Sequence, residues 1–323
     1  MGDSHNFLVR ALGGAGGAGL ITRVVRGYTF VSRHYEPGDR IFLIGFSRGA
    51  YTARAVAGLI AARGLLDARK LDLTDKEAAY RLGSSEWFEY RRAALATKAK
   101  LLDQLLEIAV DLPGFLSRPS PDTARVGATI EAVAVWDTVG ALGIPRYNRV
   151  AMRLDAFQFA DTVLSPIVRH GLHAIAVDEQ RADFTPTLWD ADARIVQVLL
   201  PGAHSDVGGG YPAKDNQSGL SDGGLEWMTT ELGRLGVRFA ATPAFAPRPD
   251  PAGIGHEPWT QPPWLVLPTA LRIFPLGLEL HHSVIERMKR DIVPLESGRA
   301  PYAPRNLATY ITGRTANAGV VVV

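Results

Sequence analysis

The stretch Ile41–Ala50, Ile-Phe-Leu-Ile-Gly-Phe-Ser-Arg-Gly-Ala, constrains the fold of this chain more than any other. An apolar run leads directly into Gly45-Phe-Ser-Arg-Gly49, a G-x-S-x-G pattern, and the residues that follow it as far as Ile60 are typical of a helix. We therefore expect a buried strand, a sharp turn and a helix in that order. The turn would raise the Ser47 hydroxyl above the end of the strand.

This order is that of the nucleophile elbow of α/β-hydrolases, where glycines let the strand and the helix approach closely. The competing interpretation is a strand that ends in a glycine-rich loop, with Ser47 acting only as a helix cap. The turn signal Glu36-Pro-Gly-Asp39 and the wholly apolar run Ile41–Ile44 favour the elbow.

Apolar periodicity predicts alternating helices and strands in much of the remaining chain. The expected helices are 20–35, 50–63, 150–175 and 224–235, and the expected buried strands are 41–45, 129–135 and 195–200. Alternating elements of this kind predict an α/β fold, namely an α/β-hydrolase-like, mostly parallel sheet with helices on both faces.

The chain has 323 residues and is predicted to form a single domain, residues 1–323. Residues 1–19 are expected to be a flexible glycine-rich start, 70–116 a helical insertion, and 240–277 a proline-rich irregular segment. Long irregular segments are usually functional or mobile.

Charge and composition exclude several classes of protein. The formal net charge of +2 gives no strong field for nucleic acid, and the absence of cysteine excludes disulfides and cysteine nucleophiles. Residues 1–20 make a poor secretory signal, and no run is long and apolar enough to span a bilayer. We expect a cytoplasmic protein, and export by a secretion machine that needs no signal stays open.

Ser47, Asp137 and His204 each follow an apolar, strand-like run by a few residues, in the chain order Ser, Asp, His. In serine hydrolases the histidine takes the proton of the serine, and the carboxylate orients the histidine. Because the carboxyl ends of parallel strands share one edge of a sheet, we predict that these catalytic residues meet there.

Both partners of the serine have other interpretations. Asp137 is also suited to cap a turn, and His204 to a structural role. With Asp206 and Gly208–Gly210, His204 also suggests a metal loop or an anion-binding loop. Too few further oxygen ligands lie nearby to favour a cation, so no metal is predicted.

A second glycine pattern, Gly14-Ala-Gly-Gly-Ala-Gly19, matches G-x-G-x-x-G. A dinucleotide site requires a strand before such a pattern, and the apolar run Phe7–Val9 is short. We therefore expect a flexible glycine loop and no cofactor.

Several stretches resemble the bacterial type VI secretion phospholipase-effector-like catalytic domain, an α/β-hydrolase family. They are Gly45–Arg54, Val135–Pro145, His173–Arg181, Gly202–Tyr211, Leu220–Asp222 before Trp227-Met228, and Ser283–Met288. The resemblance covers nearly all of residues 27–307. It implies Ser47 as nucleophile, Asp137 as orienting acid and His204 as general base. The family's better-known members cleave phospholipid acyl esters.

The sequence departs from the family at its start. Family members usually begin with a strand that ends in an Asp-Gly-Thr type segment near the active site, and Met1–Gly19 does not replace it. One oxyanion donor is expected to be the backbone N–H of Arg48, and the second donor stays open. A mis-assigned start codon and a shortened, weakly active protein are both consistent with this departure.

These features predict a serine hydrolase of carboxylic esters, favouring lipid or phospholipid acyl esters, with transient contact to a membrane surface. The alternative is a hydrolase-like module that binds a lipid or protein without turnover, and an amidase or acyltransferase would use the same residues. Residues 101–110 and 259–267 are candidate covers of an apolar cleft or else core elements. Arg54 is expected to pair with a carboxylate and brace its helix.

Overall fold

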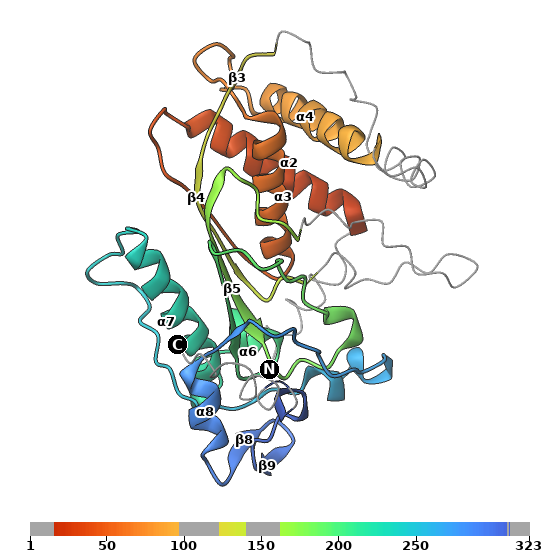
Figure 1. The fold of residues 1–323 in the computed structure, drawn as a ribbon, viewed down its shortest axis with the longest axis vertical. Coiled ribbons are helices and arrows are strands. Elements are labelled where there is room, and N and C mark those ends of the chain that lie inside the picture. The colour runs from red at the N-terminus through yellow and green to blue at the C-terminus, as the bar shows by residue number, and fades with distance from the viewer. Residues whose placement is uncertain (1–15, 97–122, 140–161, 309, 311–323) are drawn as a thin grey trace, which may run out of the picture.

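A parallel β-sheet forms the centre of the molecule (Figure 1). The computed structural model describes residues 16–96, 123–139, 162–308 and 310. Within them a five-stranded sheet has the order β1-β4-β5-β6-β7, and each neighbouring pair is parallel. This sheet confirms the predicted α/β class. Its strands are β1 (Ile41–Phe46), β4 (Ile130–Trp136), β5 (Val168–Ala176), β6 (Ile195–Leu200) and β7 (Glu279–Leu280).

Helices cover both faces of this sheet. In β4, Val133 and Val135 belong to the buried cluster that includes α3 (Arg48–Arg63), whereas Ala134 packs with α7 (Gly219–Arg234). Successive residues of a strand point to opposite faces, so α3 and α7 lie on opposite faces. The outer side of α3 is covered by α2 (Gly16–His34) and α4 (Lys76–Ala96), as Figure 1 shows.

The remaining elements are short. Two antiparallel pairs lie outside the central sheet, and brief helices occur in the connections. They are β2 (Leu65–Leu66) with β3 (Arg125–Val126), β8 (Val293–Leu295) with β9 (Gly298–Ala300), α6 (His204–Gly208), α8 (His282–Met288), and the 3-10 helices η2 (Ala182–Phe184), η3 (Lys214–Asn216), η4 (Pro258–Thr260) and η5 (Trp264–Val266).

The helix predicted over 150–175 is wrong in its described part. Residues 150–161 lie outside the description, and Val168–Ala176 form strand β5. This strand lies in the middle of the sheet and is buried on both faces over most of its length. A strand buried on both faces reads as an almost continuous apolar run, without the alternation that identifies a half-buried strand.

The structure describes only parts of the predicted segments 1–19 and 70–116, and all of 240–277. Helix α2 begins at Gly16, inside the start predicted to be flexible, because its apolar face (Ile21, Val24, Val25) packs into the core; residues 1–15 lie outside the description. Helix α4 falls within 70–116 and packs on α2 and α3. Residues 97–122, with the candidate cover 101–110, also lie outside the description. Residues 240–277 hold only short 3-10 helices and isolated bridges.

The turn between β1 and α3 depends on the glycine that closes the strand. A Cβ atom on Gly45 would lie 2.4 Å from the backbone of Gly49, whereas a Cβ on Gly49 would meet nothing within 4 Å. We expect Gly45→Ala to lower the free energy of unfolding by about 1–3 kcal/mol, because the strand end and the helix start must separate. Urea denaturation measures this loss. Gly49→Ala is the matched control, and equal losses in both variants would contradict the packing.

Candidate active site

Ser47 occupies the turn between β1 and α3 in a strained backbone conformation. Its φ of 58° and ψ of −123° lie outside the regions that L-residues ordinarily adopt, a conformation that costs about 1–3 kcal/mol and persists only where the surroundings impose it. The Ser47 amide donates to the carbonyl of Trp136 at 3.1 Å, which ties the turn to the end of β4. Its hydroxyl makes no capping hydrogen bond to the described residues of α3, whereas the helix-cap interpretation requires such a bond.

The structure brings Ser47, His204 and Asp137 together at the carboxyl ends of β1, β6 and β4. The Ser47 hydroxyl lies 2.8 Å from Nε2 of His204, and Nδ1 of the same ring lies 2.6 Å from Oδ2 of Asp137. An ionised carboxylate only accepts hydrogen bonds, so Nδ1 carries the proton and Nε2 is free to accept from the serine. Both distances are in the range that proton transfer to a general base requires.

Aromatic rings hold the imidazole of His204 in place. The ring of Phe46 lies 4.5 Å from it, and the ring of Phe184 packs against it edge-on at 5.0 Å. Phe184 in turn packs edge-on against Trp264 at 5.2 Å. The histidine is therefore buried between the end of β1, which carries Phe46, and the later 3-10 helix η2, which carries Phe184.

Asp206, which suggested a metal or anion loop, is buried and braces the start of α6. Its carboxylate accepts hydrogen bonds from the amide of Ala203 at 3.0 Å and from Nδ1 of His256 at 2.6 Å. The ring of His256 stacks on Tyr211 with 3.4 Å between centroids. The part of the chain that the structure describes contains no cluster of His, Cys, Asp and Glu able to hold a metal ion.

Asp137 is fully buried and is held from several sides. Its Oδ1 accepts from the amide of Ala176 at 3.0 Å and from Nη1 of Arg272 at 2.6 Å, and its Oδ2 accepts from Nη2 of Arg272 at 2.8 Å. Burial by itself would raise the pKa of this carboxyl. The charge of Arg272 and the hydrogen bonds from His204 and Arg272 outweigh burial and hold the pKa well below its usual range.

Burial acts on the pKa of the His204 imidazole in the opposite direction to its effect on Asp137. Burial lowers the pKa of the imidazole, because the charged form loses its hydration. The hydrogen bond and the charge of Asp137 act to raise the pKa but only partly counter burial, and the nearby charge of Arg181 lowers it further. The ring is therefore neutral at neutral pH, the form in which Nε2 can accept a proton.

Sequence reasoning missed Arg272 and the ring of Phe184. Arg272 is the only charged residue between Glu257 and Glu279, and a lone charge in so apolar a stretch is the signal that could have found it. Phe184 carries no comparable signal, because an isolated phenylalanine is ordinary core material.

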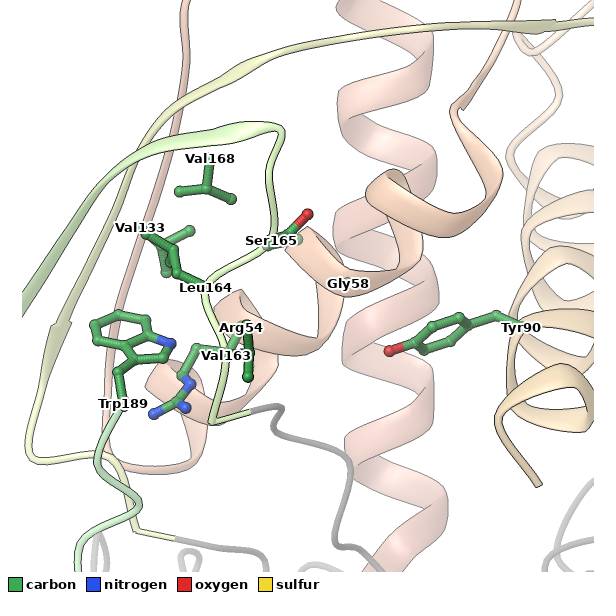
Figure 2. A pocket seen from close by; sticks show the side chains of 10 residues that line it. Arg54, Gly58, Tyr90, Val133, Val163, Leu164, Ser165, Val168 and Trp189 are labelled. Atoms are coloured by element: carbon green, nitrogen blue, oxygen red, sulfur yellow. The ribbon is translucent and has the colours of Figure 1, made fainter. Parts of the chain in front are cut away.

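Arg54 was expected to pair with a carboxylate, and that pairing stays a prediction; two of its contacts lie among the described residues. Its Nη1 donates to the carbonyl of Thr187 at 2.5 Å, and its guanidinium lies over the ring of Trp189 at 4.4 Å. Figure 2 shows both side chains at a cavity of about 30 Å³ that Ser165 also lines. That volume suits about one water molecule, so the cavity is too small for a substrate.

The chain thus has an α/β fold in which Ser47, His204 and Asp137 form a continuous hydrogen-bonded chain at the carboxyl ends of parallel strands. Residues 1–231 match the family described as the T6SS phospholipase effector Tle1-like catalytic domain. The chain belongs to this family, as the resemblance of its motifs implied. Arg272 and His256 lie beyond the matched residues.

Similar proteins are much longer than this chain. An uncharacterized protein of Saccharomyces cerevisiae, YEL023C, is 30% identical over 165 residues, which is 51% of this chain and 21% of the yeast protein. An uncharacterized Pseudomonas aeruginosa protein of known structure is 20% identical, with a TM-score of 0.33, over 66% of this chain and 26% of its own. A further match is the structure of the Tle1 effector bound to the VgrG spike from the type 6 secretion system. The two sequences are 20% identical, the TM-score is 0.30, and the match covers 60% of this chain and 31% of the matched chain.

The environment of His204 predicts how it titrates. Because burial lowers its pKa, we expect the imidazole to titrate below the usual value of 6.5, so that the ring stays neutral at pH 7 and is protonated only in more acidic solution. Nuclear magnetic resonance of the ring nitrogens over a pH series measures this value, with assignment by a His204→Gln variant. A midpoint at or above 6.5 would contradict the proposed electrostatics.

Proposed function

We propose that this chain is a serine hydrolase that cleaves carboxylic esters, with Ser47 as nucleophile, His204 as general base and Asp137 as orienting acid. The observation that carries the proposal is the continuous hydrogen-bonded chain of these residues, in which the serine is held on a strained turn. A serine hydroxyl is a weak nucleophile unless a base lies within hydrogen-bond reach and is itself oriented.

In this mechanism Ser47 attacks the acyl carbon of the ester as its proton passes to Nε2 of His204. The imidazolium then donates that proton to the leaving alcohol, and an acyl-enzyme remains. Water, activated by the same imidazole, releases the acid. Asp137 keeps the proton on Nδ1 throughout, so that Nε2 faces the reaction.

The backbone N–H of Arg48 is proposed as one donor to the oxyanion. Arg48 is the first residue of α3, and the first N–H groups of a helix have no partner within the helix. The positive end of the helix dipole also lies there, which favours a developing negative charge.

A lipid ester is the proposed substrate class, because the family is described as a phospholipase effector domain. The surface beside the site supports it. Residues 264–276, named here the apolar segment, bury Trp264 near the histidine and Arg272 on Asp137. The same segment leaves large apolar side chains in water: Leu265, Val266, Leu271, Ile273 and Leu276, of which Val266 is 86% and Ile273 is 91% exposed.

Space for part of a substrate adjoins the turn. A cavity of about 310 Å³ is lined by Phe46 and Trp136, the residues directly before Ser47 and Asp137, and by Gly208–Gly210. Its volume is at the lower limit of small-molecule sites, which are roughly 300–1,000 Å³. Among the described helices, none combines the length and apolar character needed to cross a bilayer. The exposed side chains of the apolar segment lead us to propose that it contacts a membrane surface. Because the family is described as a T6SS effector family, we also propose that the protein is exported by a secretion machine that needs no signal sequence.

Chemical labelling tests the nucleophile. A fluorophosphonate probe should modify Ser47, and Ser47→Ala should lower kcat on a short p-nitrophenyl ester by roughly 10⁴- to 10⁶-fold, because the nucleophile is lost. Peptide mapping identifies the labelled residue. Ser84→Ala is the control and should keep full activity, because Ser84 is a buried serine on α4 whose described hydrogen bond goes to the carbonyl of Tyr80 in the same helix. A folded wild-type protein that takes no label would favour a binding module without turnover.

The apolar segment predicts a difference between dispersed and soluble substrates. Val266→Asp should lower hydrolysis of phospholipid vesicles by about ten- to a hundred-fold, the loss expected for one apolar side chain that no longer leaves water. Hydrolysis of a soluble short-chain ester should stay within twofold of wild type, roughly the effect of a surface substitution. Ile292→Asp, an equally drastic change at an isoleucine that is 58% exposed outside the segment, is the control. Equal losses on both substrates would argue against surface contact there.

A further inference from the structure

Arg272 is buried, and the described hydrogen bonds of its guanidinium go to Asp137 or to residues that contact Asp137 or His204. Besides the two bonds to Asp137, its Nη1 donates to the carbonyl of Ala176 at 2.7 Å and its Nη2 to the carbonyl of Phe184 at 2.5 Å. Ala176 and Phe184 themselves touch the carboxylate and the imidazole. The arginine therefore fixes both oxygens of Asp137 in a bidentate grip, which sets the direction of the carboxylate as well as its position.

Two ion pairs lie near His204 among the described residues. The carboxylates of Asp137 and Glu179 and the guanidinium of Arg181 act on the ring, and Arg272 acts on those two carboxylates. Arg272 holds Asp137, and Arg181 holds Glu179 through bonds of 2.8 and 2.7 Å. Glu179 also accepts the amide of His204 at 3.2 Å. Each of these two carboxylates therefore has a cationic partner, which weakens the tendency of its negative charge to favour a protonated ring.

We propose that Arg272 is a positioning residue for the proposed hydrolysis, which directs the carboxylate of Asp137 at Nδ1 of His204 and keeps the imidazole a neutral base by balancing that carboxylate's charge. This inference rests on the proposed function for its catalytic part only. Its electrostatic part concerns His204 in the resting protein and can be measured without a substrate.

Two substitutions separate charge from geometry. Arg272→Gln removes the charge, so the full charge of Asp137 acts on the ring, and the pKa of His204 should rise by about one unit. The acid limb of the kcat/KM profile should move up with it, and kcat should fall by about a hundred-fold as the carboxylate loses its direction. Arg272→Lys keeps a positive charge without the bidentate fork, so the acid limb should stay in place while kcat falls by a smaller factor.

Arg287→Gln is the matched control for the loss of a buried arginine. Arg287 is 1% exposed, and its described hydrogen bonds go to the carbonyls of Pro251, Gly253 and Pro294 and not to Ser47, His204 or Asp137. This variant should be less stable than wild type, yet its His204 should titrate as in wild type. A merely structural role of Arg272 would make Arg272→Gln behave in the same way.

The outcomes are distinct for the two proposals. A folded Arg272→Gln protein whose His204 titrates as in wild type overturns the role of Arg272, whatever its esterase activity. If Arg272→Gln does not fold, Arg272→Lys decides: a lowered kcat with an unmoved acid limb supports the inference, and a wild-type kcat overturns it. Wild-type protein that takes no fluorophosphonate label overturns the proposed function instead, while the magnetic resonance titration still tests the electrostatic role.

Discussion

The buried carboxylate of Asp137 is the constraint on which the rest of the site depends. An ionised carboxyl without partners in such a place would cost several kcal/mol. The chain compensates it with donors from separate elements: the amide of Ala176 in β5, Nδ1 of His204 in α6, and both terminal nitrogens of Arg272 in the apolar segment. The partners of this one charge therefore come from β5, α6 and the apolar segment, and all three contact the end of β4.

The parallel sheet supplies the rigidity that this arrangement needs. Both Ser47 and Asp137 follow strands directly and both have positive φ, 58° and 37°, which side chains other than glycine rarely adopt. Hydrogen bonds across the strand ends hold them: the amide of Ser47 bonds to Trp136, and the amide of Asp137 bonds to Ala174. These hydrogen bonds join the ends of β1, β4 and β5 and hold both strained residues in place. The hydroxyl and the carboxylate thus lie at the two nitrogens of one imidazole.

Much of this arrangement was visible in the sequence because its signals are local. The strand, turn and helix around Ser47 follow from adjacent residues, and the meeting of Asp137 and His204 with Ser47 was predicted because each comes soon after an apolar run. Strand β5 was misread as helix because burial on both faces removes its periodicity. Arg272 was not found at all. Nothing close to it in the sequence shows where an irregular segment folds back, and its partner lies 135 residues away.

The position of Arg272 within the apolar segment has a mechanical consequence. Leu271 and Ile273 on either side of it face outwards, while the guanidinium points inwards onto the carboxylate. Peeling this stretch away from the sheet would pull apart two desolvated opposite charges, at a cost of about 3–5 kcal/mol. Thermal fluctuations would therefore populate a detached form only rarely. We therefore expect the apolar segment to keep its position against the sheet when the site is empty and when it is occupied.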